Sequence, residues 1–165
     1  MNRFEALFAP HMNAAYNLAR WLTGNDSAAH DVVQESAYRA CKYLDRFDGS
    51  NPRAWFLAIV RNESHTWLKA AMAWRWMPLD EQEVADHGES PEGLAIDAED
   101  CAHVQAALQA LAPGFREVIV LKDLQGLSYQ DIARVIDVPL GTVMSRLSRA
   151  RGQLREQLLR RRGHA

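Results

Sequence analysis

Four polar or cationic side chains near the C-terminus have the spacing of one helix face. Thr142, Ser145, Arg146 and Arg149 occupy positions i, i+3, i+4 and i+7. Arginine donates paired hydrogen bonds to guanine edges or to phosphates, and serine and threonine reach phosphate oxygens or bases. The chemistry that this set predicts is non-covalent recognition of duplex DNA in the major groove. The alternative is a basic helix face that is merely solvated.

The flanking residues predict a helix-turn-helix that would present this face. Ser128, with Asp131 three positions later, is a variant of the capping box and begins a short helix that should end near Asp137. Pro139 suits the first turn of a second helix, which should run through Arg151 or beyond. The apolar stripe of the second helix would pack on the first, and it consists of Val143, Leu147, Ala150 and Leu154.

The sequence contains no recognisable active-site or metal-ligand pattern. His30 and His65 lack companions at the spacing of a metal centre or a catalytic triad, and no glycine-rich phosphate loop occurs. Cys41 and Cys101 do not form a Cys-x-x-Cys pair, which argues against zinc and against a disulfide framework. We therefore expect no catalytic residues, no metal and no cofactor, and an enzyme is the least favoured function class.

The charge of this 165-residue chain is segregated along the sequence, although the net charge is only −2. Residues 77–103 hold nine acids and no Lys or Arg, whereas residues 104–165 hold ten basic residues and five acids. A basic C-terminal module beside an acidic segment is compatible with nucleic-acid binding. No stretch approaches the ~20 apolar residues of a membrane span, and the N-terminus does not resemble a signal sequence, so a soluble cytoplasmic protein is expected.

Helical periodicity dominates and no period-two strand is evident, which predicts an all-α fold of two small domains. The expected helices cover 4–22 with a break near Pro10, a segment capped by Asp26 or Ser27 and running to 44, then 54–73, 98–111 and 115–124, ahead of the helix-turn-helix. Residues 45–53 are dense in turn formers and should be an exposed loop. The predicted domains are 1–76 and 99–165, joined by an acidic linker, 77–98.

Motifs in four parts of the chain, taken in order, resemble the bacterial sigma-70 family, in particular its extracytoplasmic-function (ECF) group. They are Asp31-Val-Val-Gln34-Glu35, Trp55-Phe-Leu-Ala-Ile-Val-Arg61-Asn62, Gly141-Thr142-Val143 and Ser145-Arg146-Leu147. The resemblance covers nearly the whole chain apart from the linker. It implies a promoter-recognition subunit that binds core RNA polymerase and promoter DNA, both as duplex and as the melted non-template strand.

The resemblance also implies a role for each set of residues. Asp31, Gln34 and Glu35 would bind the clamp helices of the largest polymerase subunit, although alone they read as a solvated helix face. The 45–53 loop and the following helix would recognise and open the minus-ten element, because an extruded base needs a pocket with an apolar wall and hydrogen-bonding groups. The residues concerned are Phe47, Asp48, Ser50, Asn51, Arg53, Trp55, Arg61 and Asn62. Phe47 and Trp55 can alternatively be core residues.

The helix carrying Thr142, Ser145, Arg146 and Arg149 would read the minus-thirty-five element. One departure from the family is Met144, where members commonly carry Lys or Arg, and another is Thr66, where an acid is frequent. An anti-sigma factor is an expected partner, and the Trp-rich end at Trp67, Trp74 and Trp76 is one place for it. The same patch could instead dimerise a conventional helix-turn-helix repressor, or pack between the domains. The acidic linker could also lie on the basic helix and suppress DNA binding.

Overall fold

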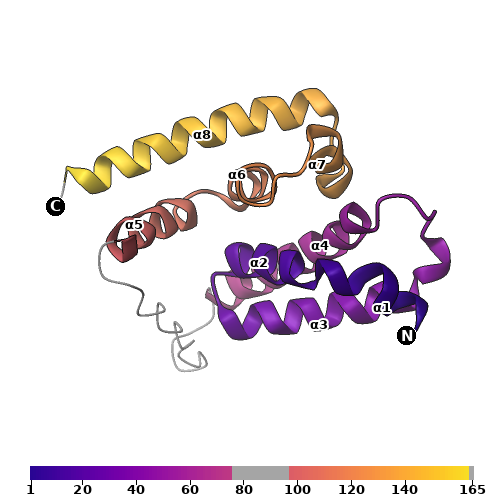
Figure 1. Ribbon diagram of the computed structural model, residues 1–165. Coiled ribbons are helices and arrows are strands. Elements are labelled where there is room, and N and C mark those ends of the chain that lie inside the picture. The colour runs from indigo at the N-terminus through magenta and orange to yellow at the C-terminus, as the bar shows by residue number, and fades with distance from the viewer. Residues whose placement is uncertain (76–96, 164–165) are drawn as a thin grey trace.

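The computed structural model describes residues 1–75 and 97–163, and the regular structure of these residues is entirely helical (Figure 1). The predicted all-α fold is confirmed. The first bundle contains α1 (Arg3–Phe8), the 3-10 turn η1 (Ala9–His11), α2 (Met12–Thr23), α3 (Asp26–Lys42), the 3-10 turn η2 (Leu44–Arg46) and α4 (Pro52–Arg75). The second contains α5 (Asp97–Gln109), α6 (Pro113–Ile119), the π-helical η4 (Val120–Leu124), α7 (Tyr129–Ile136) and α8 (Leu140–Arg162).

The connections within the first bundle follow from local chemistry. Gly24 adopts a φ of +70°, which ends α2 in the left-handed conformation that glycine adopts without strain. The side chain of Asn25 then accepts a hydrogen bond from the Ala28 N–H and caps α3. The prediction that Asp26 or Ser27 is the cap was wrong by one or two positions, because Asn25 has the extended backbone of a cap and Asp26 is already helical.

The predicted helix-turn-helix is confirmed in α7 and α8. The Ser128 side chain accepts a hydrogen bond from the Asp131 N–H, and Asp137 ends α7 with a φ of 55°. Pro139 is the N-cap of α8 rather than its first residue. The apolar stripe faces the core as expected, because Val143, Leu147 and Ala150 are buried.

The two bundles pack directly against each other. Helix α4 contacts α7, and α2 contacts α6, so that α6 and α7 lie between α8 and the first bundle (Figure 1). One continuous apolar cluster includes Phe8, Leu18 and Phe56 of the first bundle and Val118 and Ile132 of the second. Helix α3 forms the side of the molecule that is most distant from α8 (Figure 1). The surfaces predicted for polymerase and for duplex DNA therefore lie on opposite sides.

No helix in the described ranges is both long and apolar enough to cross a membrane. The proposed linker, 77–98, lies almost wholly outside the described residues, as do Trp76 and the side chain of Trp74. Trp67 is half-buried and packs against the core of the first bundle.

Candidate nucleic-acid interface

The outward face of α8 carries the first candidate set. Ser145 and Arg149 are exposed, whereas Thr142 and Arg146 are half-buried. The Ser145 hydroxyl donates to the Thr142 carbonyl at 3.1 Å, a bond within the helix that water or DNA can replace. The predicted face is therefore present, but its centre lies closer to Ser145 and Arg149 than to Arg146.

Two further side chains lie on the same exposed surface. Met144 is 53 % exposed, and Ser148 is exposed between Ser145 and Gly152, on the side of α8 opposite its buried stripe. Ser148 was not among the residues predicted from the sequence, although its three-residue spacing from Ser145 was the available signal. Met144 and Ser148 turn the predicted cationic face into one that is partly apolar and partly polar.

The arginines that follow Arg149 along α8 differ in their contacts, and some of them bind other parts of the chain. Arg151 forms an ion pair with Asp123 of η4, at 2.6 Å between Nη2 and Oδ1. Arg161 donates to the Ala106 carbonyl and so ties the end of α8 to α5. Arg155, Arg160 and Arg162 are exposed. Fewer arginines of α8 are thus free to contact DNA than the number of arginines in the sequence suggests.

The loop between η2 and α4 carries the second candidate set. The backbone N–H and the hydroxyl of Ser50 each donate to Asp48 Oδ1 at 2.8 Å. These hydrogen bonds lower the pKa of the Asp48 carboxyl. Asn51 has a φ of 45°, and its side-chain oxygen accepts from the Ala54 N–H at the start of α4. The loop is therefore a preorganised turn in which Asp48 and Ser50 are exposed.

The two aromatic residues of the set are packed inward. Phe47 is only 6 % exposed, so of the two alternatives for its ring the core position is the correct one, and the ring does not lie open on the loop. It contacts the ring of Phe8, with 5.8 Å between centroids, and that of Trp55, with 5.1 Å. Trp55 stacks on Phe8 and is half-buried. The rings of Phe47 and Trp55 gain more by packing against α1 than by facing solvent, and they support the loop from its buried side.

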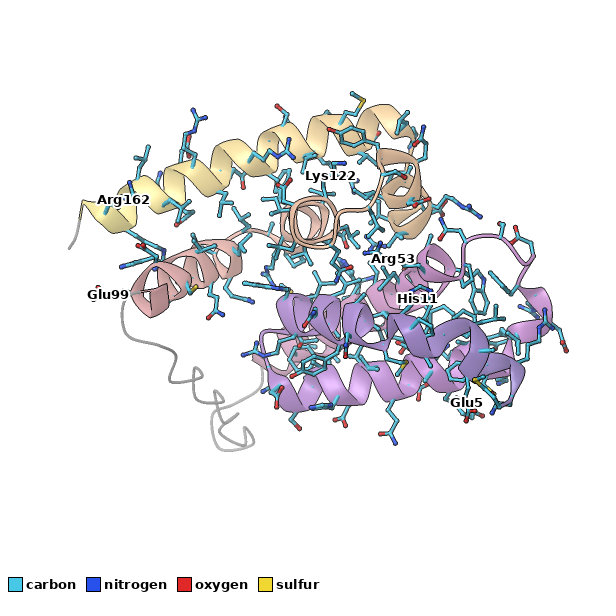
Figure 2. All side chains as sticks on the ribbon, viewed as in Figure 1. Glu5, His11, Arg53, Glu99, Lys122 and Arg162 are labelled. Atoms are coloured by element: carbon cyan, nitrogen blue, oxygen red, sulfur yellow. The ribbon has the colours of Figure 1, made fainter. Side chains whose placement is uncertain are left out.

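Three of the four cationic and amide members of the set contact the second bundle. Arg53 donates to the Gln125 carbonyl at 2.6 Å, Asn51 donates to Asp131 at 2.7 Å, and Arg61 forms two hydrogen bonds with Glu117 at 2.8 and 3.0 Å. Asn62 is exposed and accepts from Arg61. Figure 2 shows Arg53 close to His11 at this boundary between the bundles. Burial and the nearby Arg53 charge lower the pKa of His11, which favours the neutral imidazole.

The third candidate set lies on α3. Asp31, Gln34 and Glu35 are all exposed. Glu35 accepts from Arg39 at 3.1 Å, and Arg39 also pairs with Glu63 of α4 at 2.8 Å. Asp31 and Gln34 border this ion-pair network on the outer side of α3, where a partner protein has access. In the part of the chain that the structure describes, no three His, Cys, Asp or Glu side chains are grouped as metal ligands.

Two family descriptions match this chain. Sigma-70 region 2 matches residues 7–73, and sigma-70 region 4 matches residues 102–154. Together they include every residue of the three candidate sets.

Curated relatives match over most of the chain. The ECF RNA polymerase sigma factor SigE of Mycolicibacterium smegmatis is 34% identical over 166 residues, which cover 96% of this chain and 62% of the relative. SigW of Bacillus subtilis is 32% identical, covering 87% of this chain and 82% of the relative. The chain thus spans less than two thirds of the mycobacterial relative and most of the length of SigW.

Two solved structures share the arrangement of both bundles. The sigma factor RpoE in complex with the anti-sigma factor NepR from Bartonella quintana has a TM-score of 0.76 and 29% identity, covering 96% of this chain and 98% of that one. CnrH in complex with the cytosolic domain of CnrY has a TM-score of 0.69 and 29% identity, covering 94% and 86%.

Proposed function

Because this chain belongs to the extracytoplasmic-function group of the sigma-70 family, we propose that it binds core RNA polymerase, directs it to specific promoters and assists strand opening. The polymerase supplies the chemistry of transcription, and this chain selects the start site. The observation that carries the proposal is the pairing of an outward-facing α8 with a separate preorganised loop, each within a region that matches the family.

The exposed face of α8 supports recognition of the minus-thirty-five element as duplex. Ser145, Ser148 and Arg149 project from a helix whose opposite side is anchored in the core by Val143 and Leu147. A rigid helix with short polar side chains and an arginine fits the major groove, where base edges present donors and acceptors. The apolar side chain of Met144 suits contact with a thymine methyl group.

The loop after η2 supports recognition of the melted minus-ten strand. Asp48 and Ser50 offer hydrogen-bonding groups at the surface, and Asn51 and Arg53 follow them in the chain. Beneath the loop, Phe47 and Trp55 form the apolar floor. An extruded base is held by such a combination of polar groups and aromatic surface. In this proposal Arg61 and Asn62 of α4 contact the backbone of the same strand once Arg61 is released from Glu117.

Helix α3 is the proposed contact with core polymerase, through Asp31, Gln34 and Glu35. Its exposed position on the side away from α8 leaves both partners accessible at once (Figure 1). An anti-sigma factor is the proposed inhibitor, because the RpoE and CnrH structures with the same arrangement of bundles are complexes with proteins named NepR and CnrY.

Run-off transcription with purified core RNA polymerase and a library of promoter fragments tests this function. The chain should convert core enzyme into a form that initiates at a subset of promoters. A variant with Asp31→Arg and Glu35→Arg should fail to support initiation, whereas Glu5→Gln, at an exposed acid of α1, should not change it. Transcripts that are identical with and without the chain would contradict the proposal.

A further inference from the structure

Two cationic side chains approach the aromatic ring of Tyr43 at the end of α3. The Lys42 ammonium lies 5.4 Å from the ring centroid, and the Arg46 guanidinium carbon lies 4.8 Å from it. Tyr43 is half-buried, whereas both cations are exposed. A cation at such a distance over the face of a ring is attracted by the negative charge of that face. The ring therefore keeps two like charges together at one place on the surface.

The backbone after α3 sets the position of Arg46 beside the ring. Tyr43 is the last, capping residue of α3, and its carbonyl accepts a hydrogen bond from the Arg46 N–H at 2.9 Å. The turn that follows is the 3-10 segment η2, a conformation in which side chains three positions apart lie above one another. Leu44 packs against the core and Phe47 is buried, so the turn is anchored on both sides of Arg46.

Neither cation has a carboxylate partner among the described residues. Arg39, one turn earlier on α3, differs in this respect because it pairs with Glu63 of α4 at 2.8 Å. Asp45 lies between Lys42 and Arg46 in the sequence and is exposed, but it forms an ion pair with neither of them. The charges of Lys42 and Arg46 are therefore available to an anion from outside the chain.

The neighbouring residues indicate which anion this is. Arg46 directly precedes Phe47, whose ring forms the apolar floor of the loop together with Trp55. The exposed polar groups of the loop, on Asp48 and Ser50, follow within four positions. A single strand whose base enters this loop must carry its adjacent phosphates past the edge of the loop. Surfaces that bind single strands combine such aromatic groups with cations that follow the backbone.

We propose that Lys42 and Arg46 bind phosphates of the melted strand next to the base that the loop after η2 takes up, and that Tyr43 is the positioning residue that keeps the two cations together. This inference rests on the proposed minus-ten role of the loop and adds a backbone site to it. A bound phosphate reduces the repulsion between the two cations and releases counterions from the strand. Because phosphates carry no base identity, the site should add affinity without sequence preference.

The salt dependence of DNA binding measures this site. The probe is a fluorescent oligonucleotide of mixed sequence, either single-stranded or annealed to its complement, titrated with the full chain over a series of salt concentrations. Loss of one phosphate contact to a single strand should reduce the slope of log affinity against log salt by about 0.7. Arg46→Gln should show this reduction and bind several-fold more weakly at low salt. Arg3→Gln removes an exposed cation of α1 and should leave the slope unchanged.

The role of Tyr43 is tested by variants that leave the charge of the chain unchanged. Tyr43→Leu keeps both cations but removes the ring, and affinity for the single strand should fall by about two- to fivefold. Tyr43→Phe keeps the aromatic face and should bind as the unmodified chain does. Circular dichroism shows whether each variant is folded. Equal affinities of Tyr43→Leu and Tyr43→Phe would overturn the positioning role.

Two results would overturn the phosphate site itself. One is an unchanged slope in Arg46→Gln, and the other is an equal loss of affinity for the duplex probe, which would make the cluster a general site for polyanions. Failure of the unmodified chain to bind the single strand would also contradict the inference. None of these results decides promoter selection, because run-off transcription with the unmodified chain tests that function separately.

Discussion

Among single residues, Met144 makes the recognition helix of this chain distinctive. The family resemblance predicts Lys or Arg at this position, and here a thioether side chain is 53 % exposed next to Ser145 and Ser148. A cation at this place would add one phosphate contact, which is independent of base sequence. The methionine replaces that contact with an apolar surface and should shift the balance from affinity towards base selectivity.

Met144→Arg should therefore tighten binding of the polymerase complex to all promoter duplexes, and its dependence on salt should become steeper by about one phosphate contact. Filter binding over a series of salt concentrations measures both effects. Leu159→Arg adds the same charge at a position of the same helix that is 61 % exposed. If Leu159→Arg changes affinity and salt dependence equally, Met144 is not at the DNA interface.

The side chains that connect the bundles show why a sequence predicts some residues better than others. Periodicity located Val143 and Leu147 correctly, because burial of apolar stripes is a local property of one helix. Arg116 and Glu117 were read only as part of a helix, although two charges inside the apolar run from Phe115 to Leu121 were a visible signal of buried polar contacts. Their partners in the first bundle lie more than 50 positions away in the sequence, which no local pattern reveals.

At the level of elements, the N-cap of α7 determines where the helix-turn-helix begins. Ser128→Ala removes the hydrogen bond from the Asp131 N–H and should lower the free energy of unfolding by about 1 kcal/mol. Ser148→Ala makes the same chemical change in the middle of α8, where alanine is a good helix former, and should change stability by less than ~0.5 kcal/mol. Urea unfolding followed by circular dichroism measures both. Equal effects would show that the cap is not formed in solution.

The end of α7 at Asp137 was predicted well, whereas α6 begins at Pro113, two residues before the predicted start at Phe115, because proline suits the first turn of a helix. The loop before α4 was predicted less well, because its aromatic residue, Phe47, packs against a different helix. Phe47 packs on Phe8 of α1, and this tertiary contact overrides the polar character of its neighbours. The sequence therefore identified the loop and its polar groups but not which of them face solvent.

In the molecule as a whole, the packing of the two bundles against each other should depend on pH through the carboxyl of Glu117. Burial raises the pKa of this carboxyl. Hydrogen bonds from His65 and Arg61 and the charges of both lower the pKa by a larger amount, so the net pKa lies below its ordinary value of 4.5. The closed state, with the bundles packed together, therefore binds fewer protons than the open state, in which Glu117 is hydrated. Closure is favoured above that ordinary value and is lost as the pH falls below it.

Distances between nitroxide labels on Cys41 of α3 and Cys101 of α5, measured by pulsed electron resonance, should lengthen as the pH falls from neutral to below 4.5, while helical circular dichroism reports whether each bundle stays folded. Glu117→Gln cannot titrate and should show a distance distribution that changes little over the same range. A transition of equal size in the variant would assign the acid response to other carboxyls.

The arrangement of the bundles was beyond prediction from the sequence, since the linker sets only how far apart they can be. Polar contacts such as Asn51 with Asp131 have small net free energies, and small free energies do not leave a pattern in composition or periodicity. The two domains and their order were predictable, and their contact was not.

The outward face of α8 should select the upstream promoter element. Transcription by core RNA polymerase with this chain, on a library randomised over the minus-thirty-five region and read by sequencing the transcribed templates, tests it most directly. Ser145→Ala combined with Arg149→Ala should abolish enrichment of the upstream motif, and Arg160→Ala, at an exposed arginine further along α8, should keep it. If the double variant enriches the same upstream motif as the unmodified chain, the outward face of α8 does not select the upstream element.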